Sequence, residues 1–320
     1  MGETGFTARK PKNIQGGNVM ALIINHNLNA MDANRNLSNA YSALGTSTKR
    51  LSSGLRITTA ADDAAGLAIR ELMRSDVSSL NQGVRNANDA ISMIQTADGA
   101  LSVTDEKLIR MKELATQAAT GTYNSDQRLI IDSEYQAMAS EITRIASATS
   151  FNGIHLLNGN LSAGPGDIGQ YHQGSALVST GPMKIHFGTA NDCTSDYYYI
   201  AIGNSTASAL GVGLGSGAVA GASISTQALA QVALDALGAA ITSKDKIRAN
   251  LGAMQNRLSN TITNLTIQSQ NTQAAESQIS DVDVASEMTN YVRNQILTQA
   301  AVSMLAQANS LPKMALNLMG

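Results

Sequence analysis

Two adjacent carboxylates, Asp62 and Asp63, are the residues most suggestive of chemistry. Paired carboxylates support acid–base or metal chemistry when both point into one site. Neighbouring residues of a helix or strand point apart, and no His or Glu stands at ligand spacing from this pair. We expect instead that they start a helix over the following AAGLAI segment, because negative charge is stabilising at the positive end of a helix.

The other candidates for catalysis or metal binding lack the spacing that such sites need. No HExxH motif is present, and the four histidines share no metal-ligand spacing. They are His26, His155, His172 and His186. Cys193 is the single cysteine and has no catalytic signature around it, and the glycine-rich Gly213–Gly217 lacks the lysine of a phosphate loop. We therefore expect a protein that is not an enzyme and that binds no cofactor and no metal.

The composition narrows the range of partners. Charged residues make up 14% of the 320 residues and the net charge is −2, so the chain lacks the basic surface that nucleic acid or an anionic membrane requires. The chain has no Trp and three Phe, which leaves the apolar load to aliphatic residues and Met. No apolar run approaches the roughly 18 residues of a membrane span. The apolar run Val19–Ile24 is too short for a cleaved signal peptide.

The spacing of the aliphatic residues predicts long helices. An apolar stripe runs over residues 24–55, and a heptad repeat over 77–115 indicates a long helix with a coiled-coil face. The stripe consists of Leu37, Ala40, Leu44, Leu51 and Leu55, and the heptad of Val77, Leu80, Val84, Ala87, Ile91, Ile94, Leu101, Leu108 and Ala115. A short turn leads to a helix over 127–148, which predicts an antiparallel hairpin. Its expected buried side consists of Leu129, Ile130, Tyr135, Met138, Ile142 and Ile145.

The middle of the chain has a different pattern. From Phe151 to about Gly221 glycine is dense and the helical period is lost, while MKIHFG and DYYYIAIG predict short strands. The alternate side chains of Tyr197–Tyr199 are expected to pack inward, with an exposed adhesive patch as the alternative. Helical spacing returns over 226–273 and again over 281–320, where Pro312 is expected to kink the helix or end it.

The two outermost segments carry narrow apolar stripes among neutral polar residues. The C-terminal stripe consists of Met288, Val292, Ile296, Ala300, Met304, Ala308, Leu311, Ala315 and Leu318. Such helices bury too little area alone to offset the entropy lost on ordering. Pairing with each other and with further copies would stabilise them. The sequence therefore predicts a structural subunit that polymerises through its helical ends.

Several long motifs resemble those of bacterial flagellin. TKRLSSGLRITTAADDAAGLAI (residues 48–69) is similar to the N-terminal signature of that family, and RNANDAISMIQTADGAL (85–101) and the FNG at 151–153 match as well. LGAMQNRLSNTITNL (251–265) and QILTQAAVSMLAQANSLPKMALNLMG (295–320) resemble its C-terminal signatures. The resemblance covers nearly the whole chain from Met20 onward, in the order of the family.

The resemblance implies a mainly α flagellin core with coiled-coil ends, a small β region in the middle and no large outer domain. The implied parts are an N-terminal inner-core helix (20–62), outer-core helices (63–150), a β-hairpin region (151–225), a C-terminal outer-core helix (226–275) and a C-terminal inner-core helix (276–320). We further hypothesise that residues 1–19 are a non-native or mis-annotated extension and that Met20 is the natural start.

The resemblance also implies location and partners. The expected location is extracellular, in the bacterial flagellum filament, after export by the flagellar type III route without a cleaved signal peptide. The expected partners are further copies of the chain, an export chaperone at the C-terminal helix, and the distal cap and hook-junction proteins. No nucleic acid and no membrane insertion are expected. The alternative within the family is a hook–filament junction protein.

Two sets of candidate residues follow from this resemblance. The polymerisation core is expected to include Leu44, Leu51, Ile296, Ala300, Met304 and Leu311. Released monomer is expected to bind the innate immune receptor Toll-like receptor five, with contacts from Arg110, Leu114 and Glu134. The same three residues have a plainer alternative role, which is contact between subunits of the filament.

Overall fold

The computed structural model describes residues 27–162, 181–192, 195–213 and 221–319. The predicted extension 1–19, His26, His172 and Cys193 lie outside these ranges, as does most of Gly213–Gly217. Within the described ranges the chain has five helices and two small antiparallel sheets, which confirms the mainly α prediction. These residues divide into two units, the first made of 27–68 with 278–319 and the second of 69–277.

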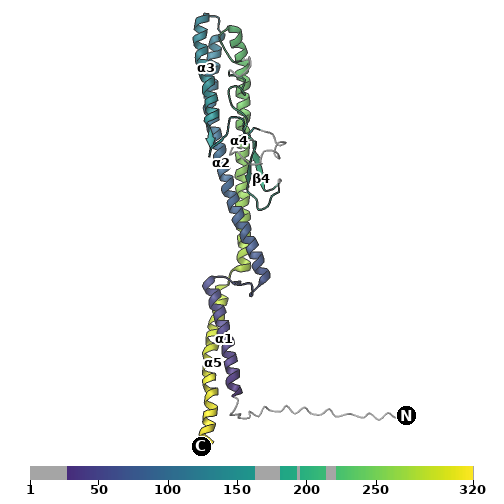
Figure 1. The fold of residues 1–320 in the computed structure, drawn as a ribbon, viewed down its shortest axis with the longest axis vertical. Helices are drawn as coiled ribbons and strands as arrows, with labels where there is room; N and C mark the ends of the chain where they lie inside the picture. The colour runs from purple at the N-terminus through teal and green to yellow at the C-terminus, as the bar shows by residue number, and fades with distance from the viewer. Residues whose placement is uncertain (1–26, 163–180, 193–194, 214–220, 320) are drawn as a thin grey trace, which may run out of the picture. The chain divides into compact units, whose positions relative to one another are not determined.

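The first unit is a pair of helices from opposite ends of the chain. Helices α1 (Leu28–Ser53) and α5 (Val284–Met319) run side by side (Figure 1). Asn27 caps the start of α1, where its side-chain oxygen accepts a hydrogen bond from the Ala30 amide at 3.0 Å. Helix α1 ends at Gly54, whose φ of +71° is the left-handed conformation that glycine adopts most readily.

Helix α5 does not end at Pro312. It continues to Met319 with Pro312 inside it, so the part of the prediction that placed a helix end there is wrong. Proline removes one amide donor and its ring crowds the preceding turn. The Ala308 carbonyl, which would otherwise accept from residue 312, instead accepts a hydrogen bond from the Asn27 side chain at 2.8 Å. A partner outside the helix thus replaces the missing bond.

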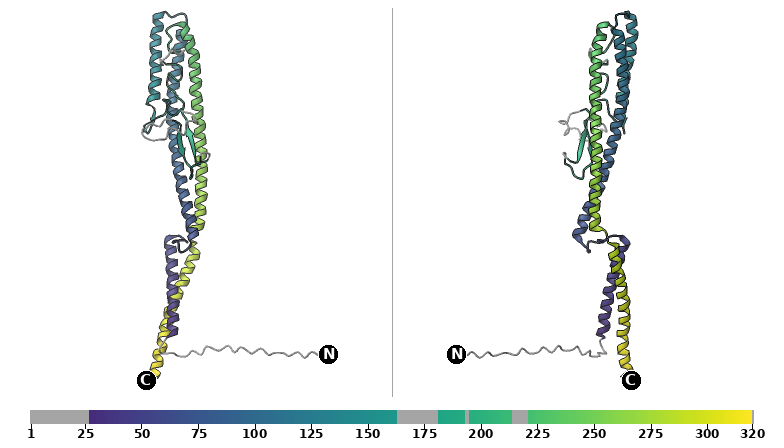
Figure 2. Two further views of the ribbon diagram at one scale, coloured as in Figure 1. Left: turned by 45° about the vertical axis from the view of Figure 1, so that its right-hand side comes forward. Right: turned by 180° about the vertical axis from the view of Figure 1, so that it is seen from behind.

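The second unit is built on three long helices. These are α2 (Ala64–Ala119), α3 (Ser125–Ala148) and α4 (Gln227–Ser280) (Figure 2). A reciprocal capping box joins the Asn124 side chain to the Gln127 amide and the Gln127 side chain to the Asn124 amide, which fixes the start of α3. Helix α4 runs about two turns past the predicted end near Gln273.

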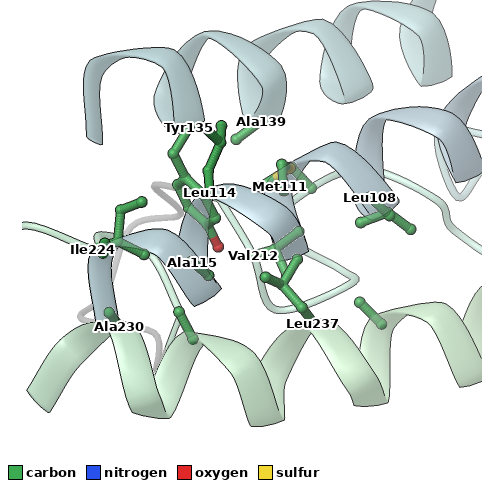
Figure 3. Close-up of a cluster of buried hydrophobic side chains, with 14 of the residues drawn as sticks. Leu108, Met111, Leu114, Ala115, Tyr135, Ala139, Val212, Ile224, Ala230 and Leu237 are labelled. Carbon is green, nitrogen blue, oxygen red and sulfur yellow. The ribbon is translucent and has the colours of Figure 1, made fainter. Parts of the chain in front are cut away.

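The heptad positions of α2 form the centre of this unit. Leu80, Ala87, Ile94, Leu101 and Leu108 are each at most 2% exposed. Figure 3 shows the part of the core where α2, α3 and α4 meet, with Tyr135 at its centre. The Tyr135 hydroxyl donates to the Gly221 carbonyl at 2.6 Å, and burial raises the pKa of this phenol.

Some aliphatic residues expected in this core are exposed instead. Leu129 and Ile130 are 56% and 70% exposed on α3, and Leu229 and Val232 are also exposed on α4. The buried face of α3 is set by Ile131, Tyr135, Ala139, Ile142 and Ala146, which recur every three or four residues. Leu129 and Ile130 come two residues and one residue before this face begins, and about 100° of rotation per residue turns them away from it.

Ion pairs also join α2 to α4. Lys244 is 1% exposed, and its ammonium lies 2.6 Å from Asp105 on α2 and 2.7 Å from Asp245. Arg248 forms two hydrogen bonds to Asp98 of α2, the shorter of 2.7 Å. The Asp98 carboxylate raises the pKa of the Arg248 guanidinium, mainly through this hydrogen bond. The buried Lys244 ammonium is thus paired with two carboxylates, which offset the cost of burying its charge.

Two short hairpins flank the helices. Strands β1 (Ser150–Phe151) and β2 (Ile154–His155) pair antiparallel, as do β3 (Met183–His186) and β4 (Tyr197–Ile200). Tyr198 packs inward against Phe187 with ring centroids 4.6 Å apart, while Tyr197 and Tyr199 contact each other edge to face. The tyrosines therefore alternate between the two faces of β4, as expected for a strand packed on one side.

The β3–β4 hairpin rests on α2 at a glycine. A Cβ atom at Gly83 would overlap the Phe187 carbonyl oxygen. Beside it, the Asn86 side chain donates to the His186 carbonyl at 2.8 Å. Gly83 therefore provides the space in which the hairpin backbone approaches the helix.

Candidate interaction surfaces

At the interface between α1 and α5, helix α1 contributes an apolar stripe and helix α5 contributes mostly small or polar residues. The predicted stripe residues Leu37, Ala40, Leu44 and Leu51 of α1 are half-buried there. The most buried residues of α5 are Glu287, Thr298 and Ala308, each 7% exposed. These three residues are 11 and 10 positions apart, which is about three helical turns in each case, so they lie on one face of α5. Helix α5 therefore packs on α1 through a face with few large apolar side chains.

The apolar stripe of α5 faces solvent. Ile296 is 59% exposed, Met304 65% and Leu311 38%, and Ala300 is exposed as well. Of the expected stripe, only Ala308 is buried among the residues whose side chains are described. The two terminal helices pair as expected, but α1 leaves most of this stripe uncovered. The spacing identifies a face that needs a further partner.

An open apolar groove follows part of this stripe. It has a volume of about 530 Å³ and is lined by Met288, Thr289, Val292, Arg293, Ile296 and Leu297. A second groove of about 430 Å³ lies between α1 and α5 and includes Met304 and Leu311. A continuous exposed apolar surface of this kind typically marks a protein-interaction site. Polymerisation candidates thus occur in two settings, with Leu44 and Leu51 in the interface and the α5 candidates on the surface.

Polar contacts close the other end of the helix pair. The Arg50 guanidinium lies 3.9 Å from the buried Glu287 carboxylate. Leu55 and Asp281 form an antiparallel β-bridge, and the Arg56 side chain donates to the Ile279 carbonyl at 2.6 Å. These contacts hold the segment after α1 against the segment before α5.

Asp62 and Asp63 stabilise the turn before α2. Asp62 accepts hydrogen bonds from the amide and hydroxyl groups of Thr58 and Thr59, at 2.9 to 3.1 Å. These bonds, led by that from the Thr58 hydroxyl, lower the pKa of Asp62 from 3.8 to about 2. Asp63 accepts from the Gly66 amide at 2.9 Å in the first turn of α2, as predicted for a helix start.

The carboxylates thus serve backbone structure. Across the ranges that the structure covers, no three His, Cys, Asp or Glu side chains gather in a metal-binding arrangement. None of the helices in those ranges is long and apolar enough to cross a membrane.

A charged network lies on the surface where α2 meets α3. Arg110 donates two hydrogen bonds to Glu134 of α3, at 3.0 and 2.8 Å, and one to Glu113 of its own helix at 3.1 Å. The side chains are 42% to 61% exposed. The hydrogen bond to Glu134 is the main reason that the pKa of Arg110 is raised. Arg110 and Glu134, which the sequence analysis placed on one candidate surface, are therefore in direct contact.

Leu114 does not belong to this surface. It is 2% exposed and packs in the core beside Tyr135 and Ala115 (Figure 3). The expectation of a direct partner contact from Leu114 is therefore inconsistent with the structure. Ile130, which the sequence placed in the core, is 70% exposed and stands one helical turn before Glu134. It supplies the exposed apolar side chain on that face of α3.

The comparisons with known proteins decide the family. Residues 24–162 match the bacterial flagellin N-terminal helical region, and residues 234–319 match the bacterial flagellin C-terminal helical region. The chain belongs to the bacterial flagellin family. Flagellin FlaB2 of Treponema pallidum (strain Nichols) is 40% identical over 93% of this chain and 100% of its own length.

Other flagellins match to a similar extent. A flagellar filament 33 kDa core protein of Treponema phagedenis is 41% identical over 93% of this chain and 100% of that protein. A flagellin of Halalkalibacterium halodurans is 39% identical, again over 93% of this chain and 100% of the relative. Helices α1 and α5, with the exposed apolar stripe of α5, lie inside the aligned family regions.

Proposed function

We propose that this flagellin-family chain is a structural subunit that polymerises through its α1/α5 unit into the bacterial flagellar filament. The observation that carries the proposal is the exposed apolar stripe of α5, with Ile296 59% and Met304 65% exposed. Relatives that align with this chain over their whole length include a protein named for the core of a flagellar filament. Swimming motility and an extracellular location in the filament are parts of the same proposal.

Burial of the α5 stripe by neighbouring copies supplies the driving force. Each large aliphatic side chain that becomes buried contributes about 1.5 to 3 kcal/mol. Because Ile296 and Met304 remain more than half exposed beside α1, a further copy can pack on them without displacing α1. Assembly is therefore compatible with the helix pair of a single chain.

The test replaces one residue of the stripe and one matched residue elsewhere. Ile296→Gln is expected to raise the critical concentration for polymerisation at least tenfold, because a buried methylene-rich contact is exchanged for an amide. Leu72→Gln changes another exposed aliphatic residue, on α2, and is expected to have a smaller effect. Sedimentation of polymer measures both. An equal effect of the two changes would show that assembly does not depend specifically on the α1/α5 unit.

The position of the subunit in the flagellum is a separate question. A filament subunit is expected in high copy number along sheared filaments, whereas the hook–filament junction alternative predicts a few copies at one end. Immunogold labelling distinguishes the two. Export by the flagellar type III route, a chaperone on α5, and contacts with cap and hook-junction proteins belong to this proposal and are tested by secretion from strains lacking each component.

We also propose that released monomer is recognised by Toll-like receptor five through the surface of Arg110, Glu113, Glu134 and Ile130. Three features support this: the charges are exposed, they are held in a fixed arrangement by mutual hydrogen bonds, and an exposed aliphatic residue adjoins them. Leu114 is left out of the direct contact because it is buried. Its role is to hold α2 against α3, so that Arg110 reaches Glu134.

A matched arginine makes this proposal testable. Arg110→Ala is expected to reduce receptor activation in a reporter-cell assay at least tenfold. Arg144 of α3 forms a similar exposed ion pair with Glu141, and Arg144→Ala is expected to leave activation unchanged. Equal potency of parent and Arg110→Ala monomer would reject Arg110 as a receptor contact and leave only the role between subunits.

A further inference from the structure

Proline within α5 leaves one carbonyl without its usual partner. In a regular helix the Ala308 carbonyl accepts from the amide of residue 312, but Pro312 has no amide hydrogen. Ala308 is 7% exposed, so water has little access to it. A buried carbonyl without a donor is costly, and α5 nevertheless continues to Met319. The position therefore requires a donor from outside the helix.

Asn27 is that donor, and it uses both ends of its amide. Its nitrogen donates to the Ala308 carbonyl at 2.8 Å, and its oxygen accepts from the Ala30 amide at 3.0 Å. The two bonds agree on the orientation of the amide, since only the nitrogen can donate. Aspartate or serine at this position can cap a helix as well as asparagine does. Aspartate has no hydrogen to give the carbonyl when ionised, and serine is shorter.

The remaining contacts of the helix pair show why this bond matters for register. A hydrogen bond joins residues 27 and 308, an ion pair joins 50 and 287, and a β-bridge joins 55 and 281. All three contacts fit one antiparallel register of the two segments. Between these contacts the α5 face has the half-buried side chains of Tyr291 and Leu305 among small and polar residues. A face with few large interlocking side chains discriminates weakly between neighbouring registers. Polar contacts at the two ends can therefore select one.

We propose that Asn27 and Pro312 act as a matched pair that fixes the register of the two terminal helices. Pro312 frees the Ala308 carbonyl, and the Asn27 side chain occupies it while capping α1. A shift of either helix by one turn moves the amide away from the freed carbonyl and leaves that carbonyl unpaired. The inference concerns the helix pair within one chain and rests on the proposed function, because packing against further copies stabilises the two terminal helices.

A double-mutant cycle on the full chain tests the pairing. Asn27→Ser keeps a capping oxygen, but its hydroxyl is on a shorter side chain that does not reach the Ala308 carbonyl. Pro312→Ala restores the amide that bonds Ala308 within the helix. Hydrogen exchange of the α1 amides in sedimented polymer measures opening of the pair. In the parent background Asn27→Ser is expected to raise the opening constant about tenfold, since a partly buried carbonyl loses its donor. In the Pro312→Ala background the same change is expected to raise it less than about threefold.

A second cap provides the control. Asn124 caps α3 within that segment of the chain, so the effect of Asn124→Ser on exchange in α3 is expected to be the same with Pro312 and with Ala at 312. Asn27→Asp serves as an isosteric check and is expected to follow Asn27→Ser. An equal effect of Asn27→Ser in both backgrounds would overturn the proposal, because Asn27 would then act only as a cap. Unprotected α1 amides in polymer of the parent chain would overturn it as well, whereas failure of the parent chain to polymerise would count against the proposed function.

Discussion

The two units of the chain differ in how far they bury their large aliphatic residues. In the three-helix unit Leu101, Leu108 and Leu237 are fully buried, while in the two-helix unit Ile296 and Met304 are more than half exposed. Both units consist of long helices with a period of three to four residues. The difference is the number of elements available to cover each helix, since α2 contacts two helices and hairpins whereas α5 has α1 alone. A helix pair can cover only one face of each member.

The comparison implies that the same Leu→Ala truncation lowers the free energy of unfolding by different amounts in the two units. Leu237→Ala is expected to lower the free energy of unfolding of the three-helix unit by about 3 kcal/mol, because a cavity opens in a closed core. Leu44→Ala, in the α1/α5 interface, is expected to cost about 1 kcal/mol or less, because Leu44 is only half-buried. Urea unfolding followed by circular dichroism of the full chain measures both. Equal costs would show that the helix pair has a core of its own.

A smaller effect is expected where the hairpin meets α2. Gly83→Ala is expected to destabilise the three-helix unit by about 2 kcal/mol, because the new methyl group overlaps the Phe187 carbonyl and displaces the β3–β4 hairpin. Gly99 lies on the same helix, and a methyl group there would have no atom within 4 Å apart from its chain neighbours and the nearby backbone of its own helix. Gly99→Ala is therefore expected to stabilise by about 0.5 to 1 kcal/mol through helix propensity. Destabilisation by both changes would contradict the close approach at Gly83.

The smallest effect concerns the turn at Asp62, in the two-helix unit. The folded pKa of about 2 lies below the ordinary value of 3.8, so the folded form binds this proton less readily than the unfolded form does. The contribution of the carboxylate is therefore complete above about pH 5 and is lost as the pH falls through about 4 toward 2. Amide exchange at Thr58 and Thr59 between about pH 5 and pH 3 measures it. In Asp62→Asn the same acid-dependent loosening is expected to disappear.

The sequence predicted the core of the three-helix unit well because that core is built from one uninterrupted repeat. The heptad of α2 keeps the same phase from Leu80 to Leu108, and the positions spaced seven apart between these two residues are all buried. The phase of α3 was harder to assign, since Leu129, Ile130 and Ile131 are consecutive and all apolar. Which of three neighbours points inward is decided by Tyr135, whose hydroxyl must reach the Gly221 carbonyl.

The candidate surfaces were only partly predictable, for a different reason. Spacing identifies an apolar face of α5 but carries no information on whether that face meets α1 or another molecule. Leu114 was assigned by resemblance to a contact surface, and its burial depends on how α3 and α4 close over α2. The Asn27–Ala308 bond joins residues 281 positions apart. No local pattern reveals such a pairing, and at Pro312 the sequence predicted only a kink or an end of the helix.

That separation has a consequence for the order of events during folding. Helix α1 can form its interface only after α5 exists, so the first helix described along the chain is among the last to acquire its partner. Closing so long a loop costs more entropy than closing a short one. Prior folding of residues 69–277 shortens the effective distance between the two ends. We therefore expect refolding to be sequential, with the three-helix unit protected first and α1 and α5 gaining protection together in a later, slower phase.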